Sequence, residues 1–177
     1  MGAWGAFIMS FFGSVFAALT MNWQWHITGA ALVLPFVIFV TIALMAGYAI
    51  RLPGPGMKPS QKVERAIMWS SIAEGVGLFL ASNIVINLHR PDLLLPSMAL
   101  VVGLHFLPIA ISAKFTPFYI LGAALIVSAV AGFVVAATAG GEFAGLMAAA
   151  ALWAAAVIAV IRDRRAKMSV VLTAPAP

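Results

Sequence analysis

Six separate runs of about 20 apolar residues constrain this chain more than any other feature of its sequence. A helix needs about 20 mostly apolar residues to cross the roughly 30 Å hydrocarbon core of a bilayer. The chain is 64% hydrophobic and 8% charged, whereas soluble proteins are about 45–50% apolar and about 25% charged. The runs are residues 3–21, 28–50, 66–88, 94–113, 117–138 and 142–161. We therefore predict an all-α, polytopic integral membrane bundle of six transmembrane helices.

The connections between these runs are too short to form a soluble domain. We predict a single transmembrane domain over residues 1–167, followed by a disordered tail over residues 168–177 that ends in alanine and proline. The first run lacks the positive region and the cleavage site of a secretory signal, so we count it as a span. No repeat relates the first three runs to the last three, which argues against a transporter built from two similar halves. The absence of cysteine excludes disulfides and thiol chemistry.

The basic residues predict which side of the membrane each connection occupies. With a cytoplasmic N-terminus, nine basic residues fall on the inside and only Arg90 falls on the outside. The positive-inside rule therefore favours an N-in, C-in topology. The net charge of +5 needs no nucleic acid as a partner, because anionic lipids of the inner leaflet attract these residues. The nine residues are Arg51, Lys58, Lys62, Arg65, Lys114, Arg162, Arg164, Arg165 and Lys167.

Three local features bear on the shape of the spans. Pro35 removes a backbone hydrogen bond and predicts a kink in the run 28–50. The proline- and glycine-rich connection 51–65 predicts a loop without regular structure, with Ser60 as an N-cap candidate for the following helix. Small residues at helical spacings in the first run predict close contact with neighbouring helices. They are Gly5, Ser10, Gly13, Ser14, Ala17 and Ala18.

Glu74 lies near the middle of the third run, where a carboxylate costs at least about 2.5 to 3.5 kcal/mol on insertion scales. It is eight residues, or about 12 Å, from the cytoplasmic end of that run. His105 is also eight residues, or about 12 Å, from the cytoplasmic end of the fourth run, which crosses in the opposite direction. Because the connection between the two runs is short, we predict that the two side chains approach within hydrogen-bond reach.

Other polar residues accompany this pair. Ser70 and Ser71 lie on the helical face of Glu74, and Ser112 lies two turns after His105 on its face. Pro108 frees the carbonyl oxygen of residue 104 as an additional acceptor. Asn83 and Asn87 face away from Glu74 and predict a second, smaller polar patch nearer the outside.

The pair admits several functions. Ionisable residues inside membranes are functional candidates by default, so Glu74 and His105 can form a proton-titratable site of a transporter or ligand-binding protein. Alternatively, they only hold two helices together in a non-catalytic accessory subunit or structural membrane protein. A third reading places Glu74 against a partner subunit, in a homo-oligomer or a larger membrane complex. An integral membrane enzyme comes last, because no nucleophile motif or metalloprotease motif is present.

The sequence predicts no cofactor and no metal ion. Haem held between helices needs two axial histidines at similar depth, and His105 has no such partner within the runs. His26, His89 and Asp92 could gather at the outer surface, but histidines near helix ends are usually solvated. Lys114 lies at the end of a run rather than in its middle, which argues against retinal attachment.

The segment 103–108, with the sequence GLHFLP, is followed by the aromatic pair Phe118 and Tyr119. With these features the chain resembles a loose group of small bacterial membrane proteins of unknown function, over about residues 66–120. The resemblance implies a multi-pass protein of the bacterial inner membrane and places emphasis on the region of Glu74 and His105. It implies no activity, because the group has none established.

Overall fold

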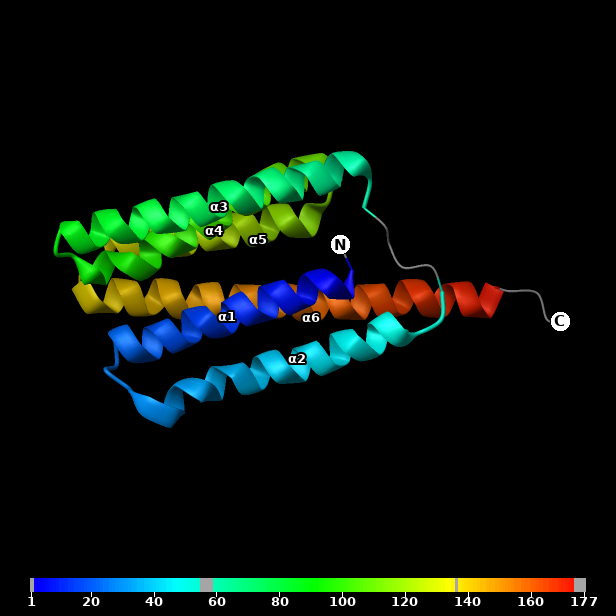
Figure 1. Ribbon diagram of the computed structural model, residues 1–177, viewed down its shortest axis with the longest axis horizontal. Helices are drawn as coiled ribbons and strands as arrows, with labels where there is room; N and C mark the ends of the chain where they lie inside the picture. The colour runs from blue at the N-terminus through cyan, green and yellow to red at the C-terminus, as the bar shows by residue number, and fades with distance from the viewer. Residues whose placement is uncertain (1, 55–58, 136, 174–177) are drawn as a thin grey trace.

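The fold is built from helices alone within residues 2–54, 59–135 and 137–173, the part of the chain that the computed structural model describes (Figure 1). Six of these helices are long and apolar enough to cross a membrane, which confirms the predicted all-helical class with six candidate spans. Two 3-10 turns, η1 and η2, precede α2 and α4. The elements are α1 (Ala3–Trp23), η1 (Gly29–Val33), α2 (Leu34–Arg51), α3 (Gln61–Asn87), η2 (Pro91–Leu93), α4 (Leu94–Ala113), α5 (Thr116–Val134) and α6 (Ala137–Thr173).

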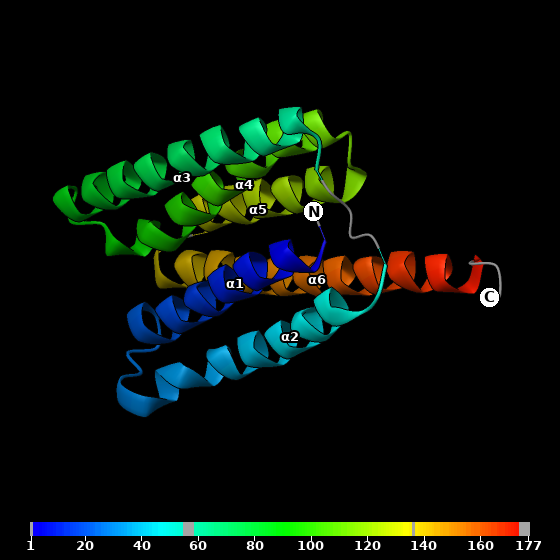
Figure 2. The ribbon, with the colours of Figure 1, turned by 45° about the vertical axis from the view of Figure 1, so that its right-hand side comes forward.

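The contacts between helices place α6 at the centre of the bundle. This helix contacts α1, α5, α4 and α2, whereas α3 packs mainly against α4, and α2 mainly against α1. Figures 1 and 2 both show α2 and α3 at opposite edges of the molecule, with α1 and α6 between them. The two edge helices therefore present most of their surface to the surroundings.

Small side chains mediate the contacts between helices. Ser10, Gly13, Ser14 and Ala17 are buried on one face of α1, in agreement with the close packing that their spacing predicted. A Cβ on Gly13 would lie 2.8 Å from the indole ring of Trp153 on α6, so this glycine is needed for the close approach. Small residues are favoured at such contacts because they let the helix backbones approach each other in a lipid environment.

α6 is much longer than the predicted span 142–161. It has 37 residues, which correspond to about 55 Å at 1.5 Å per residue. The helix includes residues 168–173, the first part of the predicted tail, while 174–177 lie outside the described residues. The segment 162–173 contains no glycine or proline, so nothing in it interrupts the helical hydrogen bonds before Pro175.

Pro35 begins a helix rather than interrupting one. It occupies the first turn of α2, directly after η1, where its missing N–H is one that has no helical partner in any case. The predicted mid-span kink is therefore wrong, because the α-helix starts later than the apolar run does. Ser60 is extended and precedes α3 as predicted, but its side chain makes no capping hydrogen bond. Residues 55–58 of the preceding loop lie outside the described residues.

Basic residues gather at one end of the bundle. The end of α2, the beginning of α3, the α4–α5 connection and the C-terminal part of α6 all lie there, together with the N-terminus (Figure 1). Every basic residue in the described part of the chain except Arg90 belongs to these segments. Arg90 lies in the turn between α3 and α4 at the other end, where it forms an ion pair of 2.8 Å with Asp92.

This charge separation predicts the orientation in the membrane. Single cysteines replacing Lys62 and Arg165 are expected to react with an impermeant thiol reagent only from the cytoplasmic side, and one replacing Gln24 only from the outside. The measurement is labelling of intact and of permeabilised cells. Labelling of this protein reports only the introduced cysteine, because the chain has no cysteine of its own. Labelling of positions 24 and 62 from the same side would contradict the six-span arrangement.

Candidate functional site

Glu74 on α3 and His105 on α4 face each other across the contact between these antiparallel helices. The Nδ1 atom of His105 lies 3.3 Å from Oε2 of Glu74, and the two side chains are 10% and 13% exposed, respectively. The matched depth inferred from the sequence therefore corresponds to a close approach. The geometry does not align them for a hydrogen bond, however, and His105 Nδ1 is a buried polar atom with no hydrogen-bond partner in the described structure.

A glycine allows the two helices to come this close. A Cβ on Gly77, one turn after Glu74 on α3, would lie 2.9 Å from Cγ1 of Val101 on α4. A larger residue would therefore require Val101 or the α3 backbone to shift. Gly75 does not contribute to this close contact, because a Cβ at this position would meet open space.

Two cavities adjoin the pair, one on each side of the α3–α4 contact. The first has a volume of 280 Å³ and lies between α1, α3 and α4. The second has a volume of 290 Å³ and is lined by α3 and α4 alone. Glu74 and His105 line both cavities. The pair thus lies between two half-open pockets and contributes polar groups to both.

The walls of both cavities are mostly apolar. Ile8, Met9 and Phe12 of α1 form one side of the first cavity, facing Ile67 and Leu78 of α3. Sequence reasoning placed the site between the third and fourth spans only, and it missed this contribution of α1. No signal in the sequence marks these α1 residues, because apolar side chains at helical spacing occur in every span.

The predicted serines are distributed unequally around the pair. Ser71 lines the first cavity and Ser70 the second. The hydroxyl of Ser70 also donates a hydrogen bond of 3.2 Å to the carbonyl oxygen of Ile67 in its own helix. Ser112 lines neither cavity, so the structure does not bring it into the site. Pro108 lines the second cavity beside Leu104, whose carbonyl oxygen it frees as predicted.

Asn83 and Asn87 lie on the exposed surface of α3. The amide of Asn83 donates to the carbonyl oxygen of Phe79 at 2.7 Å, and that of Asn87 donates to the carbonyl oxygen of Asn83 at 2.9 Å. Both side chains therefore bond to their own helix. They form a patch separate from Glu74, but one whose donors already have local partners.

His26 and His89 do not assemble a metal site in the described residues, where no group of three or more histidine, cysteine, aspartate or glutamate side chains could hold an ion. His26 and His89 occupy tight connections with positive φ angles of 53° and 55°. Asp92 is engaged by Arg90. At the same end, the indole N–H of Trp25 donates to Glu142 at 2.8 Å and ties the α1–α2 connection to α6.

The chemistry of the pair follows from these surroundings. A carboxyl and an imidazole at 3.3 Å can pass a proton between them or present it to a third group. The apolar walls disfavour a hydrated polar solute, since its lost hydrogen bonds would not be replaced. They accommodate an apolar molecule that carries one polar group toward Glu74 and His105.

Comparison of the chain with family models, curated proteins and solved structures finds no match. The functional argument therefore depends on the geometry of the site.

Proposed function

We propose that the protein is a six-span, N-in and C-in protein of the bacterial inner membrane that binds or transports a small ligand at a proton-titratable site. Glu74 is the titrating group and His105 is its partner. The ligand is a proton, alone or together with an apolar molecule that reaches the cavities from the lipid phase and carries one polar group.

The observation that carries this proposal is that Nδ1 of His105 lies 3.3 Å from Oε2 of Glu74, beside two cavities, without forming an aligned hydrogen bond. Leaving a buried polar group without a hydrogen bond costs about 1–3 kcal/mol, and buried polar groups in folded proteins are normally paired. A pair that served only to hold helices together would be expected to form an aligned hydrogen bond. A proton shared with Glu74, or a polar group of a ligand in either cavity, would supply the missing partner.

Glu74→Gln is expected to remove proton linkage without unfolding the protein, because glutamine is nearly isosteric and carries no charge. Wild-type thermal stability should change between about pH 5 and 8, where histidine and a buried carboxyl can titrate, and the profile of the variant should be flatter. Vesicles containing the wild type and a trapped pH-sensitive dye should show proton uptake after a pH jump, and those containing the variant should not.

The matched control is Glu64→Gln. This is the same chemical change on the same helix, at an exposed position in its first turn. The control is expected to behave as the wild type in both measurements. Identical pH profiles and proton uptake for wild type and Glu74→Gln would rule out the proton-linked function.

A structural role is the second candidate, favoured by the position of α3. This edge helix packs mainly against α4, and Glu74–His105 is the polar contact between them. The double variant Glu74→Leu/His105→Leu separates the two functions, because it replaces the polar pair by an apolar one. If this double variant keeps the stability and the proton-uptake behaviour of the wild type, the result would support an accessory or structural membrane protein. Such a protein would assemble into a homo-oligomer or a larger complex through the exposed face of α3.

A further inference from the structure

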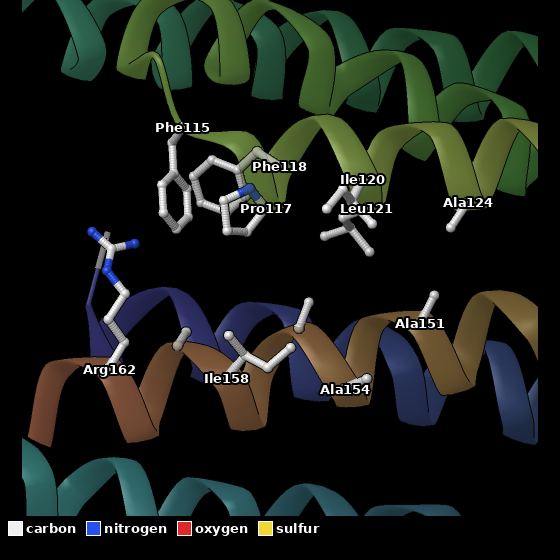
Figure 3. A pocket seen from close by; sticks show the side chains of 12 residues that line it. Phe115, Pro117, Phe118, Ile120, Leu121, Ala124, Ala151, Ala154, Ile158 and Arg162 are labelled. Atoms are coloured by element: carbon white, nitrogen blue, oxygen red, sulfur yellow. The ribbon is translucent and has the colours of Figure 1, made fainter. Parts of the chain in front are cut away.

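Another cavity, separate from the two beside Glu74, lies between α5 and α6. It has a volume of 310 Å³ and is almost entirely apolar. Figure 3 shows Ile120, Leu121 and Ala124 of α5 on one side, with Ala151 and Ala154 of α6 opposite them. Because alanines replace larger side chains along this face of α6, the two helices leave a groove here instead of a filled contact. We name it the α5–α6 groove.

One end of the α5–α6 groove carries a positive charge. Arg162 lines this end, with its guanidinium carbon 4.0 Å from the centroid of the Phe115 ring (Figure 3). Stacking on an aromatic face orients a guanidinium, whose five N–H donors point outward in its plane toward several partners at once. Lys114 and Arg165 are exposed at the same end of the bundle and add to its positive potential.

The length of the groove matches one leaflet of a bilayer. Ala151 and Arg162 are eleven residues apart on α6, which corresponds to about 16 Å along the helix axis. This is roughly half of the 30 Å hydrocarbon core. Arg162 is also the first residue after the last apolar run, at the depth where lipid headgroups lie.

We propose that the α5–α6 groove binds an anionic phospholipid of the leaflet at the basic end, with one acyl chain along the alanines and the phosphate on Arg162. The charge pattern favours a lipid over a second copy of this chain. The chain has five acidic residues: Asp92 and Glu142 lie at the opposite end, Glu74 lies at the α3–α4 contact, and Glu64 is a single exposed carboxylate at the basic end, where basic residues far outnumber it. Asp163 is buried and faces Gly2 at the start of α1, so it is poorly placed to pair with the Arg162 of another copy. This inference is independent of the site at Glu74.

Native mass spectrometry of the purified protein tests the proposal, with phosphatidylglycerol and phosphatidylcholine of equal chain length as probes. The wild type is expected to retain phosphatidylglycerol preferentially. Arg162→Gln should weaken this retention about fivefold, as expected for one basic residue near an anionic surface, and leave phosphatidylcholine unchanged. Arg164→Gln is the matched control, because it removes the same charge from an exposed position two residues away and should have little effect.

A second variant tests the groove itself. Ala155→Leu keeps Arg162 and fills the α5–α6 groove, so it should reduce retention of phosphatidylglycerol while the thermal stability stays at least as high. Equal retention of both lipids by the wild type would overturn the proposal. So would equal effects of Arg162→Gln and Arg164→Gln, or full retention by a folded Ala155→Leu variant. A lipid-free dimer that Ala155→Leu dissociates would assign the groove to a second copy instead.

Discussion

Replacing Gly103 with leucine is expected to destabilise the bundle by about 3 kcal/mol, the upper end of the range for overpacking a tightly packed contact. Gly103 on α4 faces Gly122 on α5 where the two helices cross. A Cβ on either glycine would lie 3.0 Å from the carbonyl oxygen of the other, and one on Gly103 would also lie 3.0 Å from the backbone nitrogen of Ile126. These obstacles are backbone atoms, which cannot rotate away, so α4 and α5 would have to separate.

The measurement is thermal or denaturant-induced unfolding of the purified protein in detergent. Gly47→Leu is the matched control, because it makes the same substitution near the C-terminal end of α2, where a Cβ would meet no atom within 4 Å. The control is expected to be neutral or slightly stabilising, since leucine favours the helix more than glycine does. Equal stability of the two variants would show that the α4–α5 crossing is looser than the structure indicates.

Lys167→Met is expected to cost about 2 to 3 kcal/mol, because it removes hydrogen bonds from a charged donor and leaves two acceptors without their partner. The Nζ atom of Lys167 donates to the carbonyl oxygens of Ala49 and Ile50, both at 2.9 Å. These carbonyls end α2, where the helix itself supplies no N–H partner. Lys167 is buried, so water replaces these bonds only if α2 moves away from α6.

Methionine keeps most of the length and apolar character of lysine, so the variant mainly removes the charge and its donors. Lys62→Met provides the comparison, because Lys62 is exposed in the first turn of α3, and surface substitutions usually stay within about 0.5 kcal/mol. Unfolding in detergent again reports the difference. A Lys167→Met protein as stable as Lys62→Met would mean that the end of α2 does not depend on α6.

The approach of Glu74 to His105 could be predicted because depth in a membrane helix follows from residue counting. Each residue advances a helix by about 1.5 Å, and a short turn makes consecutive spans antiparallel neighbours. These two facts place both side chains at one level without knowledge of the packing. The orientation of the imidazole, the missing alignment of its Nδ1 atom for a hydrogen bond and the wall that α1 supplies depend on side-chain packing, which residue counting does not address.

The links of Lys167 to α2 and of Ser14 to Pro35 could not be predicted in this way. The hydroxyl of Ser14 donates to the carbonyl oxygen of Pro35 at 2.7 Å, and the indole N–H of Trp153 lies 3.3 Å from both Ser14 Oγ and the carbonyl oxygen of Ser10. Each link joins two helices that are neighbours only because of the way the bundle packs. The small residues of α1 predicted a close contact but did not identify its partner helix.

By itself, the sequence determined the number and approximate positions of the six candidate spans, the separation of charge between the two ends and the matched positions of Glu74 and His105 along their helices. All of these follow from which residues are stable in water and which are stable in lipid. Only the tertiary structure decided which face of each helix is buried, because lipid is as apolar as the protein interior and the hydrophobic pattern therefore does not mark the inner face. In this bundle the inner faces carry alanine, glycine and serine, and many large apolar side chains face outward. The cavities beside Glu74 and the α5–α6 groove result from that arrangement of small and large side chains.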